Sequence, residues 1–145
     1  MKSIYHDVKA VLVAEKINGD NETISTSVVD TAGYEGCAFL IGASKGEVAA
    51  LTAKARQDTD AAGGTMADLE GTSIAIPTAV ATPASGIIDV YQPRERYLQC
   101  QVVVPNVTIP IAVQVWALLY GAHSVPVTQT ATASEFHQSP AEGTA

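Results

Sequence analysis

The sequence is poor in several residue types, and each shortage excludes a class of protein. Lysine and arginine together number 8 of 145 residues, against 15 aspartates and glutamates, so the formal net charge is −7. Because proteins bind phosphate backbones through clustered basic side chains, nucleic acid is not an expected partner. Charged residues are 16% of the chain and hydrophobic residues 47%, a composition that excludes intrinsic disorder.

Long hydrophobic runs are also missing. The longest apolar-rich stretch, 112–120, is far shorter than the about 20 residues of a membrane helix, so no membrane span is expected. Polar residues interrupt the first residues, where a secretory signal would be apolar. Two cysteines, Cys37 and Cys100, are too few for a disulfide framework. We therefore expect both to be free, buried thiols in a reducing compartment.

What the chain has in quantity is β-branched residues: 16 valines, 10 isoleucines and 14 threonines. They recur in short blocks between turns rich in glycine, proline and asparagine, which is typical of sandwiches and barrels. The blocks predict strands over 24–29, 37–42, 86–91, 97–104 and 111–120. Both alternating faces of 111–120 are mostly apolar, so we expect this strand to be buried on both sides.

Residues 47–56 fit two structures. Helix propensity is high there, and Ser44 and Glu47 have the spacing of a capping box. The strand interpretation places Leu51, Ala53 and Ala55 inward, and we favour it because a helix would have only a thin apolar stripe. In this interpretation Lys45-Gly46 forms a hairpin turn.

The C-terminal segment differs from the rest of the chain. From Gly121 onward there is no lysine or arginine, and the residues are mostly small and polar. Such a segment is either a frayed tail or an arm that becomes ordered on a neighbouring subunit. The prediction is therefore an all-β protein, a jelly-roll-like β-sandwich over 1–125, with a partly extended C-terminal arm over 126–145.

Chemistry is hard to find in the sequence. His6, His123 and His137 make no metal-binding pattern, and there is no nucleophile elbow, phosphate loop or dinucleotide motif. A weak cation site could use Asp58, Asp60 and Asp68, although the calcium-loop match fails after its first positions, and a solvated loop is favoured. We predict no enzyme activity, no catalytic residues, no metal and no cofactor.

Two further features allow a binding role. Arg94 and Arg96 are close enough to grip a carboxylate of a partner, but a local ion pair with Glu95 or a nearby aspartate is slightly favoured. Trp116 and Tyr120 share one strand face and could form a sugar platform, as could Tyr5, Tyr34 and Tyr91. For Trp116 and Tyr120 ordinary core packing is favoured because their neighbours are apolar.

Several sequence stretches carry a resemblance to a known family, and their order along the chain is more informative than any single stretch. They are Val28-Val29-Asp30-Thr31-Ala32-Gly33-Tyr34-Glu35-Gly36, residues 57–71, Arg94-Glu95-Arg96-Tyr97-Leu98, Leu118-Leu119-Tyr120-Gly121-Ala122, Pro126-Val127-Thr128-Gln129 and residues 139–144. Together they span about residues 26–144 and resemble a family of small head proteins of tailed bacteriophages and prophages.

The resemblance implies a virion structural protein, of the capsid decoration or cement type, that has no active site to transfer. Such a protein would be made in the cytoplasm of a bacterial host and would bind the major capsid protein and copies of itself on the capsid surface, commonly as trimers. The candidate intersubunit contacts are Arg94, Arg96, Val127, Gln129 and Phe136. Alternatives are a head-spike base, a tail protein, or a carbohydrate-binding β-sandwich module.

Overall fold

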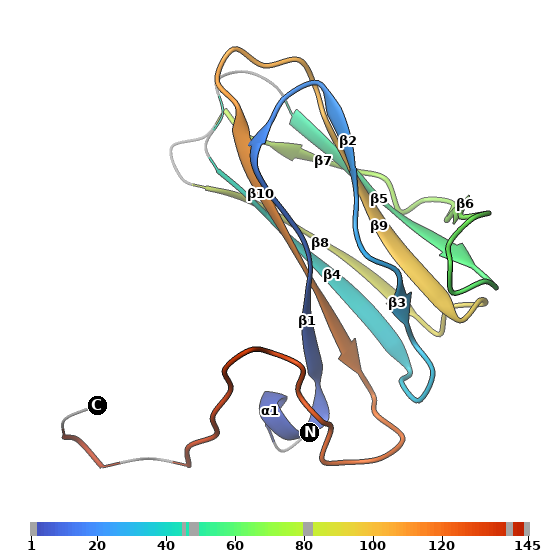
Figure 1. Ribbon diagram of the computed structural model, residues 1–145, viewed down its shortest axis with the longest axis vertical. Coiled ribbons are helices and arrows are strands. Elements are labelled where there is room, and N and C mark those ends of the chain that lie inside the picture. The colour runs from blue at the N-terminus through green and yellow to red at the C-terminus, as the bar shows by residue number, and fades with distance from the viewer. Residues whose placement is uncertain (1–2, 45, 47–49, 80–82, 139–140, 144–145) are drawn as a thin grey trace.

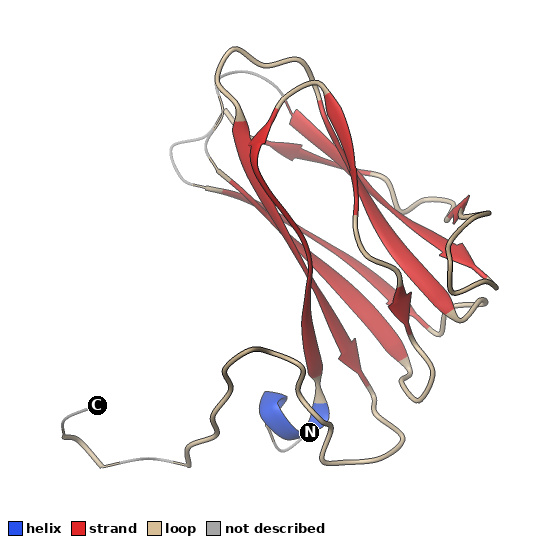
Figure 2. Cartoon of the chain, in the orientation of Figure 1, coloured by secondary structure: helices blue, strands red, loops and turns tan. Residues whose placement is uncertain are grey.

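The computed structural model describes residues 3–44, 46, 50–79, 83–138 and 141–143. Within these residues the chain forms one short helix and two antiparallel sheets that pack against each other (Figures 1 and 2). The elements in chain order are α1 (Ile4–Asp7), β1 (Lys9–Gly19), β2 (Glu22–Ser25), β3 (Val29–Asp30), β4 (Gly36–Ala43), β5 (Ala50–Asp58), β6 (Ala67–Asp68), β7 (Ile74–Pro77), β8 (Ala84–Tyr91), β9 (Tyr97–Val104) and β10 (Ile111–Tyr120).

The strand order is that of a jelly roll. The first sheet has the order β1-β10-β4-β8. In the second sheet β9 pairs with β2 and β3 on one side and with β5 on the other, and β5 also pairs with β6 and β7. From β7 onward, consecutive strands alternate between the two sheets, as a jelly roll requires. The predicted all-β sandwich is confirmed.

The core lies between the inner faces of the two sheets. Alternate residues of each strand point inward because the side-chain period of a strand is two. β5 and β9 supply Leu51, Leu98 and Val102, and β4 and β10 supply Phe39 and Val115, all of which are fully buried. The core therefore covers one face of each sheet and leaves the other face outside the core.

Strand β10 corrects one expectation. Its inward residues Val113, Val115, Ala117 and Leu119 are buried as predicted. Its other face is not buried, because Gln114 is exposed and the remaining residues of that face are intermediate. The prediction that β10 is buried on both sides is therefore wrong. The sandwich has two layers, and within the described residues no third layer covers this sheet.

The segment 50–58 is a strand, which confirms the favoured interpretation for the described part of 47–56. Leu51, Ala53 and Ala55 point inward and are fully buried. The hairpin at Lys45-Gly46 is wrong, because β4 and β5 lie in different sheets and do not pair. Gly46 instead donates its N–H to the carbonyl of Thr78 at 3.0 Å, and Lys45 and residues 47–49 lie outside the described residues.

Four other strand predictions are confirmed, two of them with the predicted bounds and two with slightly longer strands. The strands predicted over 37–42, 86–91, 97–104 and 111–120 are β4, β8, β9 and β10. The block 24–29 is divided into β2 and β3, because Thr26 turns its hydroxyl into the ladder and accepts the Cys100 N–H at 3.0 Å. The strands β1, β6 and β7 and the helix α1 are not among the predicted elements. Ser3 caps α1 by accepting the His6 N–H at its hydroxyl, at 3.2 Å.

The C-terminal segment forms no helix or strand among its described residues. After β10 ends at Tyr120, the chain passes α1 and runs away from both sheets (Figure 1). The side chains of 131–138 are all exposed. No described helix is long and apolar enough to cross a bilayer.

Candidate functional site

An apolar row crosses the outer face of the four-stranded sheet. The strand register places Leu12 opposite Trp116, Trp116 opposite Leu40, and Leu40 opposite Ile87. Side chains in direct cross-strand register lie about 5 Å apart at their Cβ atoms, so the four form one continuous stripe. Ile87 is 65% exposed and Leu12 42% exposed. A contiguous apolar stripe on an outer face is a candidate interaction surface, unlike apolar residues scattered singly.

A hollow of about 380 Å³ adjoins this row. Gly42 forms part of its lining, two residues from Leu40 along β4 and on the same face, together with Glu15, Ile17, Pro83 and Ala112. Among the described residues, the atom nearest to a Cβ at Gly42 would be the Gln114 carbonyl oxygen at 3.9 Å, so the space above Gly42 is open. Ile17 is 69% exposed. The hollow has the size and the largely apolar walls to admit one large side chain.

The other side of the row is framed by Tyr120. Its hydroxyl donates a 2.6 Å hydrogen bond to the Asp89 carboxylate, reaching across β4. Its ring lies over Gly36, where any Cβ would overlap the ring. Burial, and then the Asp89 carboxylate, raises the pKa of the Tyr120 hydroxyl. Tyr91 on β8 is 59% exposed and lies opposite Gly36 in register.

The charges on this face have one sign. The charged side chains at the outward positions of β1, β10, β4 and β8 are Glu15 and Asp89, one on each side of the apolar row. Lys16 also lines the hollow, but its ammonium group is 3.0 Å from the Glu22 carboxylate. The face is therefore an apolar centre between two carboxylates.

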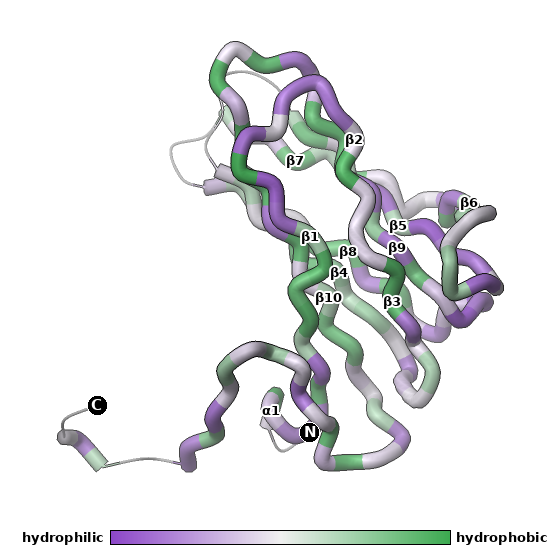
Figure 3. The backbone as a smooth tube through the Cα atoms, viewed as in Figure 1, coloured by the Kyte–Doolittle hydropathy of each residue, from purple (hydrophilic) through white to green (hydrophobic). Residues whose placement is uncertain are grey.

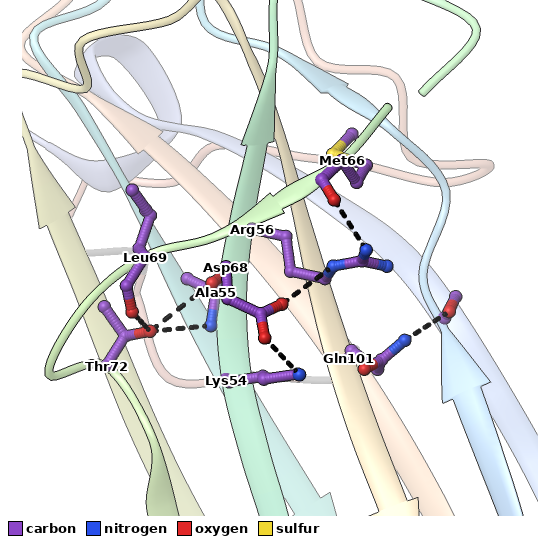
Figure 4. Close-up of polar contacts among 9 residues, drawn as sticks. Lys54, Ala55, Arg56, Met66, Asp68, Leu69, Thr72 and Gln101 are labelled. Carbon is purple, nitrogen blue, oxygen red and sulfur yellow. Dashed lines mark hydrogen bonds and ion pairs between the residues drawn. The ribbon is translucent and has the colours of Figure 1, made fainter. Parts of the chain in front are cut away.

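The outer face of the six-stranded sheet has a different chemistry. Asp68 accepts the Lys54 ammonium at 2.6 Å and lies 3.1 Å from the Arg56 guanidinium (Figure 4). The hydrogen bond from Lys54, joined by the two positive charges, lowers the pKa of the Asp68 carboxyl. Gln101 reaches the Ser25 hydroxyl at 3.3 Å on the same face. In Figure 3 long stretches of β1 and β10 are coloured hydrophobic, whereas β6 and its neighbours carry hydrophilic residues.

The two arginines singled out in the sequence are used differently. Arg96 grips the Asp30 carboxylate with two nitrogens, at 2.8 and 2.7 Å, and lies 5.2 Å from the centre of the Tyr97 ring. This local ion pair, the favoured alternative, lowers the pKa of the Asp30 carboxyl. Arg94 is exposed and lines a loop hollow of about 490 Å³ beside Tyr34 and His123. An intersubunit role for either arginine stays a prediction.

The predicted contact residues of the arm touch the chain's own N-terminal segment. Val127 donates its N–H to the His6 carbonyl at 2.8 Å. The Gln129 amide donates to the carbonyls of Tyr5 and Val8, at 2.8 and 2.6 Å, and accepts the Ala10 N–H at 3.3 Å. The ring of Phe136 packs on the rings of His6 and Tyr5. These contacts tie the arm, from Val127 to Phe136, to α1 and β1, and contact with another subunit stays a prediction.

Core packing, the favoured alternative for the aromatic pair Trp116 and Tyr120, is wrong. Trp116 and Tyr120 lie on the outer face, each of intermediate exposure. The Trp116 indole N–H donates to the Gln114 side-chain carbonyl at 3.2 Å. Trp116 is the chain's single tryptophan, so its fluorescence reports on this face.

The suggested cation site is not assembled. The Asp58 carboxylate accepts the Thr65 N–H at 2.8 Å and the Asp60 N–H at 3.0 Å, so it closes its own loop. Asp68 is instead paired with Lys54 and Arg56. In the part of the chain that the structure describes, no three histidine, cysteine, aspartate or glutamate side chains gather as metal ligands would.

Both cysteines are core residues. Cys37 and Cys100 are free and fully buried, as predicted. Burial raises the pKa of each thiol to about 12, which keeps both protonated near neutral pH. Since the thiolate is the reactive form, neither sulfur is suited to act as a nucleophile.

Sequence reasoning missed the apolar row itself. Each member is an ordinary strand residue, and the row exists only once four strands are placed in register. Three of its members, Leu40, Ile87 and Trp116, lie in predicted strands, but only Trp116 was assigned to a particular strand face. The chain matches no family model, and it matches no curated protein.

Proposed function

We propose that the protein is a structural component of a phage virion, a capsid decoration or cement protein that acts through contact surfaces. The observation that carries the proposal is the apolar row of Leu12, Trp116, Leu40 and Ile87 on the outer face of a rigid sandwich. A protein that stabilises a shell needs a stiff body and a surface that matches its neighbours. The order of the phage-like sequence stretches supports the same function.

The repetition of a shell explains why a modest surface is enough. A symmetric lattice presents the same binding site many times, and contacts to neighbouring sites add through effective concentration. The arm, anchored at Gln129 and again where Phe136 packs on α1, offers further contact area at little cost to the sandwich.

The test uses empty expanded heads of the phage that encodes the chain, prepared without this protein. Adding the purified protein is expected to give saturable binding at a defined copy number, measured by sedimentation and gel densitometry. Absence of binding to any head assembly contradicts the proposal. Immuno-gold labelling of the tail instead of the head identifies a tail component.

Carbohydrate binding is the second candidate, because Trp116, Tyr120 and the 59%-exposed Tyr91 all lie on this face. The aliphatic neighbours Leu12, Leu40 and Ile87 suit a protein partner better than a sugar, whose hydroxyls need polar partners. Specific hits on a glycan array, together with no binding to heads, would favour this candidate.

A further inference from the structure

The outer face of the four-stranded sheet combines three features that restrict its partner. Its centre is the apolar row, its flanks carry the carboxylates of Glu15 and Asp89, and an open hollow lies over Gly42 beside Leu40. An apolar centre with a polar rim is the usual layout of a protein–protein contact. The sign of the rim charges then selects among protein partners.

A second copy of this chain is a poor complement for the face. Any face-to-face contact of two copies brings together surfaces whose rim charges, Glu15 and Asp89, are all negative, in a chain of net charge −7. Four of the chain's eight lysines and arginines are already paired with carboxylates of their own chain, namely Lys16, Lys54, Arg56 and Arg96. Like charges placed together across an interface are unfavourable and suppress the wrong partner.

We infer that this face binds a different protein, one that presents an apolar side chain flanked by lysine or arginine. The inference rests on the proposed function, and it assigns the head-shell protein, not another copy of the chain, to this face. The apolar side chain of the partner enters the hollow over Gly42, and its basic residues lie against Glu15 and Asp89. Contacts between copies of the chain then use other surfaces.

The apolar part of the inference is tested with the expanded heads described above. Leu12→Ser and Ile87→Ser are each expected to weaken head binding about tenfold, because each removes apolar area from the contact. Gly42→Leu is expected to weaken it similarly by filling the hollow, and the open space above Gly42 allows the protein to fold. The matched control is Val103→Ser, which removes an apolar side chain, 38% exposed, from the opposite outer face and should leave binding unchanged.

The charged part is tested by Glu15→Gln combined with Asp89→Asn. Asparagine keeps an acceptor for the Tyr120 hydroxyl, so the local hydrogen bond survives. This double variant should weaken head binding about threefold at about 0.05 M salt and have no effect at about 0.5 M, where the charges are screened. Glu70→Gln, an exposed carboxylate in the loop after β6, is the control and should have no effect.

The outcomes separate the two proposals. If the wild-type chain binds heads and the Leu12, Ile87 and Gly42 variants bind like Val103→Ser, the assigned face is wrong while the proposed function stands. If the double charge variant binds more tightly at low salt, the partner is not basic and the inference is overturned. If sedimentation velocity shows dimers or trimers of the free protein that Ile87→Ser dissociates, the face belongs to a second copy. Failure of the wild-type chain to bind heads contradicts the proposed function itself.

Discussion

Both outer faces of the sandwich are formed by the outward residues of antiparallel strands, but one face carries ion pairs and the other carries apolar side chains. On the six-stranded sheet, Asp68 holds Lys54 and Arg56 in a network of ion pairs that suits water. On the four-stranded sheet, Leu12 and Ile87 leave apolar area exposed beside Trp116. Folding requires only that the inner faces be apolar, so an apolar outer face is not explained by the stability of the monomer. The difference supports the proposal that one face meets solvent and the other a partner.

The largest expected effect is a difference in the free energy of unfolding between substitutions on the inner and outer faces of one strand. Phe39 and Leu40 are consecutive residues of β4, but Phe39 is fully buried and Leu40 is only partly buried on the outer face. Phe39→Ala should lower the free energy of unfolding by about 3–5 kcal/mol, because it removes contacts and leaves a cavity. Leu40→Ala should lower it by about 1 kcal/mol, because Leu40 packs only against its strand neighbours on the open outer face and its removal leaves no enclosed cavity.

Urea unfolding followed by circular dichroism measures both changes. Equal losses of stability for Phe39→Ala and Leu40→Ala would mean that the outer face is already covered in the free protein. That result would remove the distinction between the two faces of this sheet.

A smaller expected effect is a loss of stability at acid pH. The carboxyl pKa values of Asp30 in β3, Asp58 at the end of β5, and Asp68 in β6 are all lowered by hydrogen bonds, chiefly from Arg96, the Asp60 N–H and Lys54 respectively. A carboxyl whose pKa is lowered on folding stabilises the protein above its unfolded pKa, near 4, and this stabilisation is lost as the pH falls through the folded pKa. The free energy of unfolding should therefore be level above about pH 5 and fall below about pH 4.

The loss of stability at acid pH should arise from carboxylates of the six-stranded sheet. Asp58→Asn is expected to make the fall in stability below about pH 4 shallower, since it removes one of the titrating groups. Glu70→Gln is the control and should leave the slope unchanged. Thermal unfolding measured from about pH 7 to about pH 2 tests this, and an unchanged slope for Asp58→Asn would contradict it.

Local patterns predicted the strands but not their partners. The period-two pattern around Leu51, Ala53 and Ala55 was enough to choose a strand over a helix, because it depends only on neighbouring residues. The hairpin at Lys45-Gly46 failed because which strands pair depends on the whole fold. The strand β1 was missed because a bulge between Leu12 and Ala14 breaks its alternation of inward and outward residues. The consecutive charged residues Glu15 and Lys16 interrupt the apolar pattern further.

The candidate site shows the same limit more strongly. The favoured ion pair of Arg96 with an aspartate was correct in kind, but Asp30 lies 66 positions away in sequence, and only the pairing of β3 with β9 brings it near. The assignment of Trp116 to the core failed because an apolar strand face does not reveal whether it meets the other sheet or a different molecule. An apolar outer face and a second buried face look identical in sequence.

The most direct measurement of the central claim follows Trp116 when the protein binds heads. Replacing this single tryptophan biosynthetically with 5-hydroxytryptophan allows it to be excited apart from the tryptophans of the shell. If the apolar row is the docking face, its emission should shift to shorter wavelength and quenching by acrylamide should fall on binding, with Val103→Ser behaving like the wild type. Head binding that leaves both the emission and the quenching of Trp116 unchanged would show that the protein docks through another surface.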